Sequence, residues 1–586
     1  MQSVCKKMQS VCKLVQSVCT KSPCLSAWES QLRKTAACRR PPASIEKRRE
    51  TPITRHEICI FATNSSNMIY PIGIQTFETI RNRGCVYVDK TALVHKLVTE
   101  GSIYFLCRPR RFGKSLLVST LRSYFEGRKD LFEGLAIENL ETEWAKYPVF
   151  HFDFNGANFT NEGELEKKLN SQLCDYEQIY GKNPTKETLG ERFQYQLESA
   201  YRQTGRQAVV LVDEYDKPIL DALETPLEDK NREILKGFYS TFKSADASLR
   251  FVLLTGVTKF SQVSVFSGFN QPKDISMNPA YDALCGITEE ELHTVFAEPI
   301  KEMADHFGYT VEQMREEFKR RYDGYHFSEV MTDIYNPFSV LNALDSKRLA
   351  DFWFSTGTPT YLIKLLNHTR ENINDLVGDT YEASMFADYR ADVERPLPML
   401  YQSGYLTIKG YDPEDQSYKL DFPNNEVSNG FLSLIASGYF SGPQRNSISR
   451  ELAKLLRKGE VDGFVTTLTA FLADIPYDSH DGLEDIKATE KFFQYTFYLI
   501  LRLMGTYCKA YVEKRGSFGR SDCIVETKDY VYIFEFKLDG TAEEALAQIE
   551  SKGYATPYLA DKRQVRKLGI VFSSETRTIS EWKMEQ

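Results

Sequence analysis

The stretch IYFLCRPRRFGKS, residues 103–115, decides the fold of the larger part of this chain. Its first four residues form a short apolar run, which predicts a strand buried on both faces of a parallel sheet. Leu117, Leu121 and Phe125 then recur at helical spacing and predict a helix that begins near Lys114. A strand, a loop ending in Gly-Lys-Ser and a helix form a phosphate-binding loop, because the loop amides and the helix N-terminus can surround phosphate oxygens.

We expect this loop to bind ATP. Lys114 would reach the β- and γ-phosphate oxygens, and the hydroxyl of Ser115 would bind Mg²⁺. The loop departs from the pattern G-x-x-x-x-G-K-[ST], because Arg108 stands where the first glycine is expected and the turn must form without it. The side chains of Arg110 and Arg111 either add phosphate contacts or are simply solvated. The residues expected to bind the cofactor are Arg110, Arg111, Phe112, Gly113, Lys114 and Ser115.

An acidic pair follows a second apolar run, VVLVDE, at residues 209–214. Asp213 would belong to the Mg²⁺ shell, and Glu214 could polarise an attacking water. The alternative is a buried strand that ends in an ordinary acidic surface turn. A third run ends at Thr255, with Lys259 just beyond, where a polar residue either senses the γ-phosphate or only caps the strand.

Further apolar runs complete a βα alternation. Residues 149–154 (VFHFDF) and 251–254 (FVLL) are predicted strands, and long segments of helical periodicity separate the runs. Repeated βαβ units indicate a doubly wound α/β sheet, in which ligands bind at the carboxyl ends of the strands. The fold class is therefore α/β, a P-loop NTPase with a parallel sheet.

Five motifs together resemble those of the AAA-ATPase-like family. They are YPIGIQTFETIRNRGCVYVDKT (70–91), RPRRFGKS (108–115), LVDEYDKPI (211–219), TGVTKFSQVSVFSGFN (255–270) and YDGYHF (322–327). That family consists of P-loop proteins that are frequently fused to a C-terminal PD-(D/E)XK nuclease-superfamily domain. The resemblance covers the chain from about Met68 onward and implies ATP binding and hydrolysis, with Lys114, Ser115, Asp213 and Glu214 in the roles given above.

A second candidate site lies near the C-terminus. In the predicted strand YIFEFK (532–537), Glu535 and Lys537 are two residues apart and so project from the same face. A hairpin around Lys528-Asp529 brings Asp522 onto the neighbouring strand. Two carboxylates can hold Mg²⁺ against a scissile phosphate while a lysine positions or deprotonates water. The alternative is an ordinary pair of opposite charges on an exposed strand face.

The spacing D-x₁₂-E-x-K resembles the site of PD-(D/E)XK enzymes. This resemblance makes Asp522, Glu535 and Lys537 catalytic candidates, with Asp522 and Glu535 as metal ligands. Gln548, on the helix predicted to follow near Thr541, would complete the site. Glu490, on an amphipathic helix predicted at 489–504, has a weaker claim to ligate metal. We expect Asn270 and Asp274 to cap turns, and His326, Trp353 and Phe354 to pack in the core.

The expected organisation has five parts. Residues 1–67 contain a heptad repeat (MQSVCKK, MQSVCKL, VQSVCTK) and are expected to be disordered or a non-native extension, with a transit peptide as an alternative. Residues 68–284 form the P-loop domain, 285–400 a helical coupling region, 401–484 a mixed connecting region, and 485–586 a small α/β nuclease-like domain.

Composition limits the partners of the chain. The net charge is −8, and residues 1–50 hold eleven Lys and Arg against three acids, a surplus of eight, so the rest carries −16. An acidic surface of this kind argues against broad coating of nucleic acid but permits a local basic cleft. The twelve cysteines lack C-x-x-C pairs, and reduced thiols in a cytoplasmic compartment are expected. No apolar run is long enough for a membrane span.

The leading hypothesis is an ATPase whose nucleotide state controls a Mg²⁺-dependent nuclease-like domain acting on DNA or RNA. The rival is a nucleotide-dependent switch or scaffold whose C-terminal domain binds a partner without cutting it. A small-molecule kinase is a third, weaker interpretation, because the Asp-Glu pair suits water activation better. The sequence leaves the oligomeric state open, with a homo-oligomer among the options.

Overall fold

The computed structural model describes a large part of the chain beyond residue 67. The described residues are 68–260, 272–356, 377–387, 396–439, 445–473, 500, 504, 508–516, 519–576 and 578–585. The expectations for residues 1–67, for Asn270, for Glu490 and for most of the helix at 489–504 therefore lie outside the described residues.

A five-stranded sheet forms the centre of the first domain, and its strands follow the predicted apolar runs. The strand order is β2-β3-β4-β1-β5, and every neighbouring pair is parallel. β3 is buried along its whole length, as expected for an apolar run covered by helices on both faces. The strands are β1 (Ile103–Cys107), β2 (Val149–Asp153), β3 (Ala208–Asp213), β4 (Leu249–Gly256) and β5 (Lys273–Asp274).

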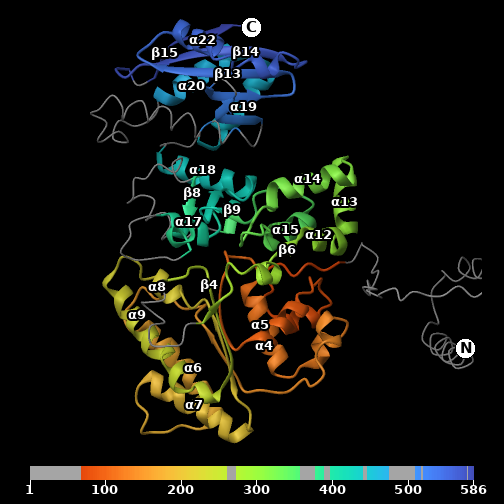
Figure 1. Cartoon of the computed structure of the whole chain (residues 1–586), viewed down its shortest axis with the longest axis vertical. Coiled ribbons are helices and arrows are strands. Elements are labelled where there is room, and N and C mark those ends of the chain that lie inside the picture. Colours follow the sequence, from red (N-terminus) through yellow and green to blue (C-terminus); the bar gives the residue numbers. More distant parts are fainter. Residues whose placement is uncertain are drawn as a thin grey trace, which may run out of the picture. The chain divides into compact units, whose positions relative to one another are not determined.

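Helices cover both faces of this sheet. Figure 1 shows α4 and α5 on one side and α6 to α9 on the other, so the sheet is doubly wound. The α-helices are α3 (Phe77–Asn82), α4 (Thr91–Glu100), α5 (Lys114–Phe125), α6 (Glu164–Tyr180), α7 (Leu189–Thr204), α8 (Lys217–Leu220), α9 (Pro226–Tyr239) and α10 (Thr241–Ser244). Short 3₁₀ turns are η2 (Lys129–Phe132), η3 (Ala136–Asn139) and η4 (Asp246–Ser248).

The register of the strands places their ends together. Cys107 at the end of β1 pairs with Gly256 of β4, and Val212 of β3 pairs with Leu254 of β4. β4 therefore lies between the strand that leads into the P-loop and the strand that ends in the acidic pair. All three loops leave from one edge of the sheet, where ligands bind in open parallel sheets.

The next region is mainly helical, as predicted. Residues 289–307 form two helices, α12 and α13, that meet at Phe296. Pro299 explains the break, because its ring would clash with the carbonyl of Val295 if one helix continued through both. The elements are η5 (Pro279–Leu284), β6 (Ile287–Thr288), α12 (Glu289–Val295), α13 (Ala297–Phe307), α14 (Val311–Tyr322), β7 (Ile334–Tyr335), α15 (Pro337–Ser346) and η6 (Phe354–Thr356).

A small antiparallel sheet and four described α-helices follow. The sheet has the order β8-β10-β9. Its elements and the helices are β8 (Thr380–Glu382), η8 (Ala383–Met385), α17 (Leu397–Gln402), β9 (Thr407–Asp412), β10 (Ser417–Asp421), α18 (Asn425–Tyr439), α19 (Arg445–Lys458) and α20 (Val461–Ala473).

The C-terminal sheet is mixed, with the order β11-β12-β13-β14-β15 and one parallel pair, β13 with β14. Its elements are β11 (Lys509–Gly516), β12 (Gly519–Glu526), β13 (Tyr530–Leu538), α22 (Ala542–Ser551), η10 (Thr556–Tyr558), β14 (Gln564–Phe572) and β15 (Ile579–Glu585). Thr541 caps α22 with a reciprocal capping box to Glu544, which explains why the helix begins where the sequence predicted.

The two faces of β13 contact different helices. Phe534 belongs to a core with Phe464 of α20, whereas Ile533 belongs to a core with Ile549 of α22. Successive side chains of a strand point to opposite faces, so Glu535 and Lys537 share the α22 face with Ile533. Residues of α19 and α20 pack in the same core as this sheet, although both helices lie in the predicted connecting region, 401–484.

Candidate functional site

The P-loop connects β1 to α5 and contains two residues in the left-handed region. Arg111 has φ 70° and Gly113 has φ 93°. Arg108, at the position of the missing glycine, is not among the residues with positive φ, so a side chain costs no backbone strain there. Its guanidinium is buried, donates to the carbonyls of Cys107 (2.9 Å) and Ser276 (2.7 Å), and lies 4.0 Å from the centre of the Phe327 ring. Arg108 therefore anchors the start of the loop instead of facing phosphate.

Lys114 is the first residue of α5 and is buried. Its ammonium donates to the carbonyl of Arg108 (2.8 Å) and to that of Pro109 (3.1 Å), so it folds back across its own loop. The amides in the first turn of a helix have no intrahelical acceptor and carry its positive dipole end. This end of α5 can receive an anionic oxygen beside Lys114 and Ser115.

The other predicted loop residues differ in their surroundings. Arg110 and Arg111 are exposed, and the Arg111 guanidinium lies 5.3 Å from the Phe338 ring centre. Phe112 is buried, with its ring 4.7 Å from that of Tyr325. Phe112 therefore offers only its backbone to a ligand.

Asp213 and Thr255 meet at the ends of β3 and β4. The Thr255 hydroxyl donates to Asp213 Oδ1 (2.8 Å), and the Glu214 amide donates to the same oxygen (3.1 Å). Among the described residues, both hydrogen bonds to this carboxylate go to Oδ1, which leaves Oδ2 as the oxygen that can turn to a cation. Thr255 thus fixes the orientation of the predicted metal ligand.

Glu214 adopts φ 53°, which turns its side chain out of the line of β3. Burial raises the pKa of Glu214 above its usual value, and the positive charge of Lys114 partly opposes that shift. A carboxyl group with a raised pKa accepts a proton more readily near neutral pH. Lys114 of the P-loop therefore lies close enough to Glu214 for their charges to influence one another.

Asp216 lies in the loop after β3, next to the acidic pair, and was not predicted as a site residue. Its buried carboxylate accepts hydrogen bonds from the amides of Val257 (2.9 Å) and Thr258 (2.6 Å) and from the Thr258 hydroxyl (2.8 Å). The loop after β3 is thereby tied to the loop after β4. The third acid in DEYD was the available signal, but spacing alone could not show that it points inward.

Gly256 permits this close approach. A Cβ atom there would lie 2.6 Å from Asp216 Oδ1 and 2.7 Å from Cδ1 of Tyr215. Any side chain at this position would push the acidic loop away from β4.

An apolar cavity of about 100 Å³ adjoins Gly113 and Leu116 of the P-loop region. Its walls come from the segment before β1, including Val86 and Val88, and from α15, including Pro337 and Leu341. Aliphatic side chains on two sides of a slot can hold a flat aromatic group.

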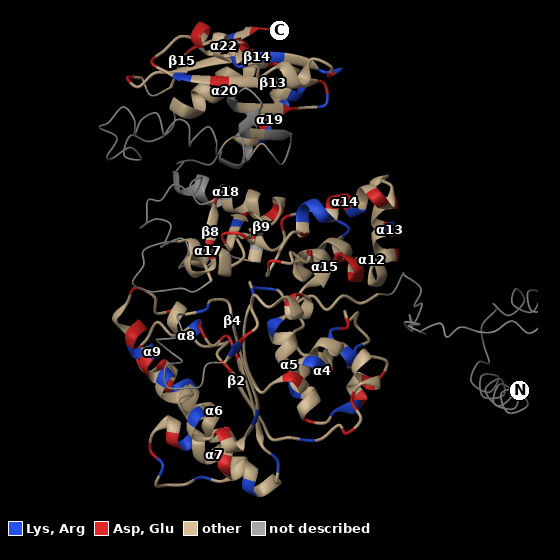
Figure 2. Cartoon of the chain, in the orientation of Figure 1, with Lys and Arg blue, Asp and Glu red and all other residues tan. Residues whose placement is uncertain are grey.

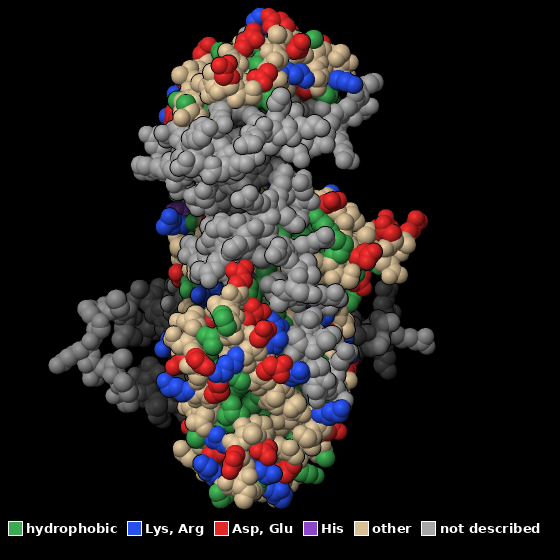
Figure 3. Space-filling view, turned by 90° about the vertical axis from the view of Figure 1, so that its left-hand side faces the viewer, with side chains coloured by type: hydrophobic (Ala, Val, Ile, Leu, Met, Phe, Trp, Pro, Cys, Tyr) green, Lys and Arg blue, Asp and Glu red, His purple; other side chains and the backbone are tan. Residues whose placement is uncertain are grey.

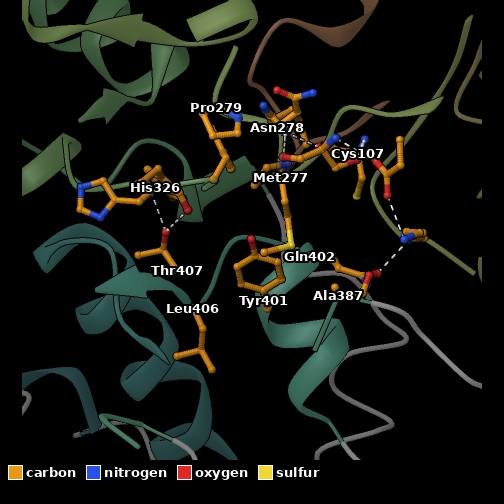
Figure 4. A pocket seen from close by; sticks show the side chains of 17 residues that line it. Cys107, Met277, Asn278, Pro279, His326, Ala387, Tyr401, Gln402, Leu406 and Thr407 are labelled. Carbon is orange, nitrogen blue, oxygen red and sulfur yellow. Dashed lines mark hydrogen bonds and ion pairs between the residues drawn. The ribbon is translucent and has the colours of Figure 1, made fainter. Parts of the chain in front are cut away.

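A second cavity, of about 390 Å³, lies beside the first residues of the P-loop (Figure 4). Lys114 and Ser115 are not among its lining residues. Gln402 in its wall accepts the Lys259 amide (2.9 Å), and the Lys259 ammonium pairs with Asp274 (2.9 Å). Asp274 also accepts the Ser276 amide (2.8 Å), so it caps a turn as expected.

His326 also lines this cavity. Its Nε2 lies 2.8 Å from Asp333 and its Nδ1 lies 2.7 Å from the carbonyl of Ile408. The residue is buried, as predicted, and polar contacts hold its ring in place.

At the C-terminal candidate site, three predicted side chains form a connected set. Gln548 of α22 donates a hydrogen bond to Glu535 Oε1 and accepts one from Lys537 Nζ (2.6 Å). Lys537 Nζ is 3.9 Å from Glu535 Oε1, and the Glu535 side chain is 1% exposed against 29% for Lys537. Gln548 therefore orients both the acid and the base.

Asp522 lies on β12, immediately before Cys523, which pairs with Phe534 on β13. Its backbone is thus next in register to Glu535, as the hairpin predicted. The side chain of Asp522 lies outside the described residues, as does Glu490.

Gly569 lets α22 approach the sheet at this point. It pairs with Glu535 across β13 and β14, and a Cβ on it would lie 2.4 Å from the Ala542 carbonyl. Sequence reasoning missed Gly569, since a lone glycine in a strand gives no sign of what packs on it.

Metal binding at either site needs ligands beyond the protein groups described. Among the described residues, no three His, Cys, Asp or Glu side chains gather as a metal site. Ser115 and Asp213 supply two oxygen ligands of the hard type that Mg²⁺ prefers, and Mg²⁺ commonly completes its shell with substrate phosphates and water. The donor set of the P-loop therefore fits Mg²⁺ bound together with a nucleotide.

Surface charge is mixed where it can be seen. Acidic and basic residues both occur along α6, α7 and α9 (Figure 2), and both signs are interspersed on the face shown in Figure 3. None of the helices in the described ranges combines the length and the apolar character that a bilayer-spanning segment requires.

Comparison with known families gives two matches. The profile described as "Predicted AAA-ATPase" matches residues 71–266, and the profile of the PD-(D/E)XK nuclease superfamily matches residues 488–582. A protein of Azotobacter chroococcum mcd 1, described as an uncharacterized protein in the vnfD 5′ region, is 36% identical over 522 residues. The match covers 87% of this chain and 97% of that protein.

Two solved structures are distantly similar. The Aeropyrum pernix ORC1 protein in complex with DNA has a TM-score of 0.21 and 10% identity, over 75% of this chain and 87% of that one. Drosophila ORC bound to GC-rich DNA and Cdc6 has a TM-score of 0.20 and 10% identity, over 80% of this chain and 78% of that one. TM-scores this low support no statement about ligands or partners.

Proposed function

Because this chain belongs to the AAA-ATPase-like family and carries a C-terminal domain of the PD-(D/E)XK nuclease superfamily, we propose that it binds and hydrolyses ATP and that its nucleotide state controls Mg²⁺-dependent cleavage of nucleic acid. The observation that carries the first part is the meeting of Lys114, Asp213, Glu214 and Thr255 at one edge of the parallel sheet.

The phosphates of ATP would occupy the N-terminal end of α5. Amides of the loop and of the first helical turn donate to the phosphate oxygens, and Lys114 exchanges its carbonyl partners for the β- and γ-phosphates. Ser115 and Asp213 would hold Mg²⁺, which supplies charge neutralisation at the phosphates. The apolar cavity lined by Val86 and Leu341 would receive the adenine base.

Glu214 orients and deprotonates the attacking water. Its position next to Asp213 supports this role, as does its raised pKa, which suits proton acceptance near neutral pH. Thr255 keeps Asp213 in the orientation that binding requires.

In the C-terminal domain, Glu535 would hold Mg²⁺, with Asp522 as the second ligand that the motif spacing implies, and Lys537 would position or deprotonate the attacking water. Gln548 supports this assignment, because it links Glu535 to Lys537 and so fixes the base relative to the metal ligand. Bound Mg²⁺ supplies charge stabilisation at the scissile phosphate.

The rival function is a nucleotide-dependent switch whose C-terminal domain binds a partner without cutting it. The net charge of −8 and the mixed surface charge favour it, since neither provides a broad basic surface for nucleic acid. In this case Glu535 and Lys537 remain an internal charge pair.

Two single variants separate these functions. Lys114→Ala should abolish ATP binding and hydrolysis, and Glu535→Ala should abolish cleavage while sparing hydrolysis. Plasmid, single-stranded DNA and RNA are incubated with each protein in Mg²⁺ or Mn²⁺, with EDTA as control. Cleavage that persists in Glu535→Ala refutes the nuclease assignment, and wild-type protein that does not bind Mg·ATP refutes the ATPase assignment.

A further inference from the structure

Two carbonyl groups of the P-loop are held by residues outside the loop. The indole Nε1–H of Trp353 donates to the carbonyl of Arg110 (3.0 Å), and the amide of Gly286 donates to the carbonyl of Phe112 (3.1 Å). Neither donor belongs to the strand or the helix that the loop connects. The conformation of the loop is therefore set partly by the helical region.

These bonds fix the direction of the loop amides. In a trans peptide the carbonyl and the N–H of the next residue point in opposite directions. The carbonyl of Arg110 points to Trp353, so the N–H of Arg111 points away from it. The same holds for the N–H of Gly113 relative to Gly286. The amides of Arg111 and Gly113 therefore both point away from the residues that hold the neighbouring carbonyls.

Trp353 is itself held firmly. It is 6% exposed, and its ring centre lies 5.3 Å from that of Tyr405. Its backbone amide donates to Glu426 Oε1 (2.6 Å), and the other oxygen of Glu426 accepts from the Ser339 hydroxyl (2.7 Å). Glu426 lies in the first turn of α18 and Ser339 in α15, so one carboxyl group joins two helices to the residue that contacts the P-loop.

We propose that Trp353 is a positioning residue for the nucleotide, which holds the Arg110 carbonyl outward and so presents the Arg111 amide to phosphate. Glu426 keeps Trp353 in place, and the docking of α18 thereby influences nucleotide affinity. This proposal rests on the proposed ATP site but makes a separate claim about what sets its affinity.

Loss of the Trp353 hydrogen bond should weaken nucleotide binding and leave the chemical step of hydrolysis largely unchanged. Trp353 hydrogen-bonds the backbone of the loop, whereas the proposed metal ligand Asp213 lies at the end of β3. Loss of the Trp353 hydrogen bond allows the peptide between Arg110 and Arg111 to rotate. Nucleotide binding must then restore the original orientation of this peptide, which weakens the affinity. The dissociation constants for Mg·ATP and Mg·ADP should therefore rise together, by about threefold to tenfold, the range for one hydrogen bond.

The test compares Trp353→Phe with Trp144→Phe in the full-length chain. Trp144 lies in the P-loop domain but outside the loop itself. It also donates its indole N–H to a backbone carbonyl, that of Glu141 (3.1 Å). Dissociation constants for Mg·ATP and Mg·ADP are measured by calorimetry, and KM and kcat for ATP hydrolysis by phosphate release. We expect Trp353→Phe to raise both dissociation constants and KM, with a change in kcat below about twofold, and Trp144→Phe to change none of them.

A second variant, Glu426→Ala, removes the acceptor of the Trp353 amide and should raise the dissociation constants in the same direction. Thermal unfolding shows that each variant is folded under the assay conditions. The positioning role is overturned if folded Trp353→Phe and Glu426→Ala bind Mg·ATP and Mg·ADP with wild-type affinity. It is also overturned if Trp144→Phe loses as much affinity as Trp353→Phe. A wild-type chain that binds no Mg·ATP overturns the ATP site itself, a result distinct from either.

Discussion

The hydroxyl of Thr255 donates a hydrogen bond of 2.8 Å to Oδ1 of Asp213, and neither residue is more than 3% exposed. One residue ends the apolar run of β3, and the other stands near the end of the neighbouring β4. The carboxylate proposed to bind Mg²⁺ is therefore oriented by the strand that lies between it and the P-loop.

Thr255→Val should lower the kcat of ATP hydrolysis by about tenfold, the cost of one buried hydrogen bond to a charged group. The substitution keeps the shape of the side chain but leaves Asp213 free to rotate. Thr255→Ser keeps the hydroxyl and should restore most of the rate. Phosphate-release kinetics at saturating Mg·ATP measure the effect, and equal rates in Thr255→Val and wild type would contradict it.

Gly256→Ala should destabilise the first domain and lower ATP hydrolysis. The added Cβ would lie 2.6 Å from Asp216 Oδ1, so the acidic loop must shift. Gly237→Ala is the matched control, because Gly237 lies on the exposed side of α9 with no atom within 4 Å of the added Cβ. That change should stabilise the domain by up to about 1 kcal/mol through helix propensity.

Thermal unfolding and phosphate release are measured on both glycine variants. Equal melting temperatures and rates in the two variants would show that the contact between Gly256 and Asp216 does not restrict the loop.

Gln548→Ala should reduce Mg²⁺-dependent cleavage by at least about tenfold, since Glu535 and Lys537 both lose the amide that orients them. Gln564→Ala, an exposed change at the first residue of β14, should leave cleavage unchanged. The assay is endonuclease activity on the substrate that the wild-type chain cuts. Full activity in folded Gln548→Ala would remove Gln548 from the site.

Glu426 gives a pH dependence of stability whose sign follows from its burial. Burial raises its pKa from 4.5 to about 8, with nearby Asp351 adding to the shift. Below pH 4.5 the carboxyl group is neutral in both the folded and the unfolded chain. Between these values the folded chain holds a proton that the unfolded chain has released, so this group makes stability fall as pH rises, and the full cost applies above about pH 8.

Glu426→Gln should therefore have the same melting temperature as the wild type near pH 4 and a higher one near pH 9. Differential scanning calorimetry at the two pH values measures the difference. A wild-type chain that is equally or more stable than Glu426→Gln at pH 9 would show that Glu426 ionises without cost.

Much of the fold could be predicted because its signals are local. The apolar runs at 103–106, 149–154, 209–212 and 251–254 all became strands of the parallel sheet, since strands covered on both faces need apolar side chains throughout. Within the predicted helical region, residues 289–307 form two helices, because Pro299 in the first turn of α13 prevents α12 from continuing, a boundary that hydrophobic periodicity does not indicate.

The candidate sites were partly predictable for the same reason. Glu535 and Lys537 share a strand face by the two-residue period, and Gln548 was expected on the helix that follows. The role of Arg108 was not predictable, because its guanidinium finds acceptors at Ser276 and Tyr281, far along the chain.

Residue order and short-range periodicity are enough to predict the parallel sheet, the P-loop at its edge and the strand that carries Glu535 and Lys537. The groups that hold these site residues in position can be identified from the tertiary structure alone. Trp353 meets the carbonyl of Arg110 across 243 positions, and Asp216 turns inward to clamp the loop after β4. The physical reason is that such contacts arise from packing between elements distant in sequence, where burial and direction depend on neighbours that residue spacing does not specify.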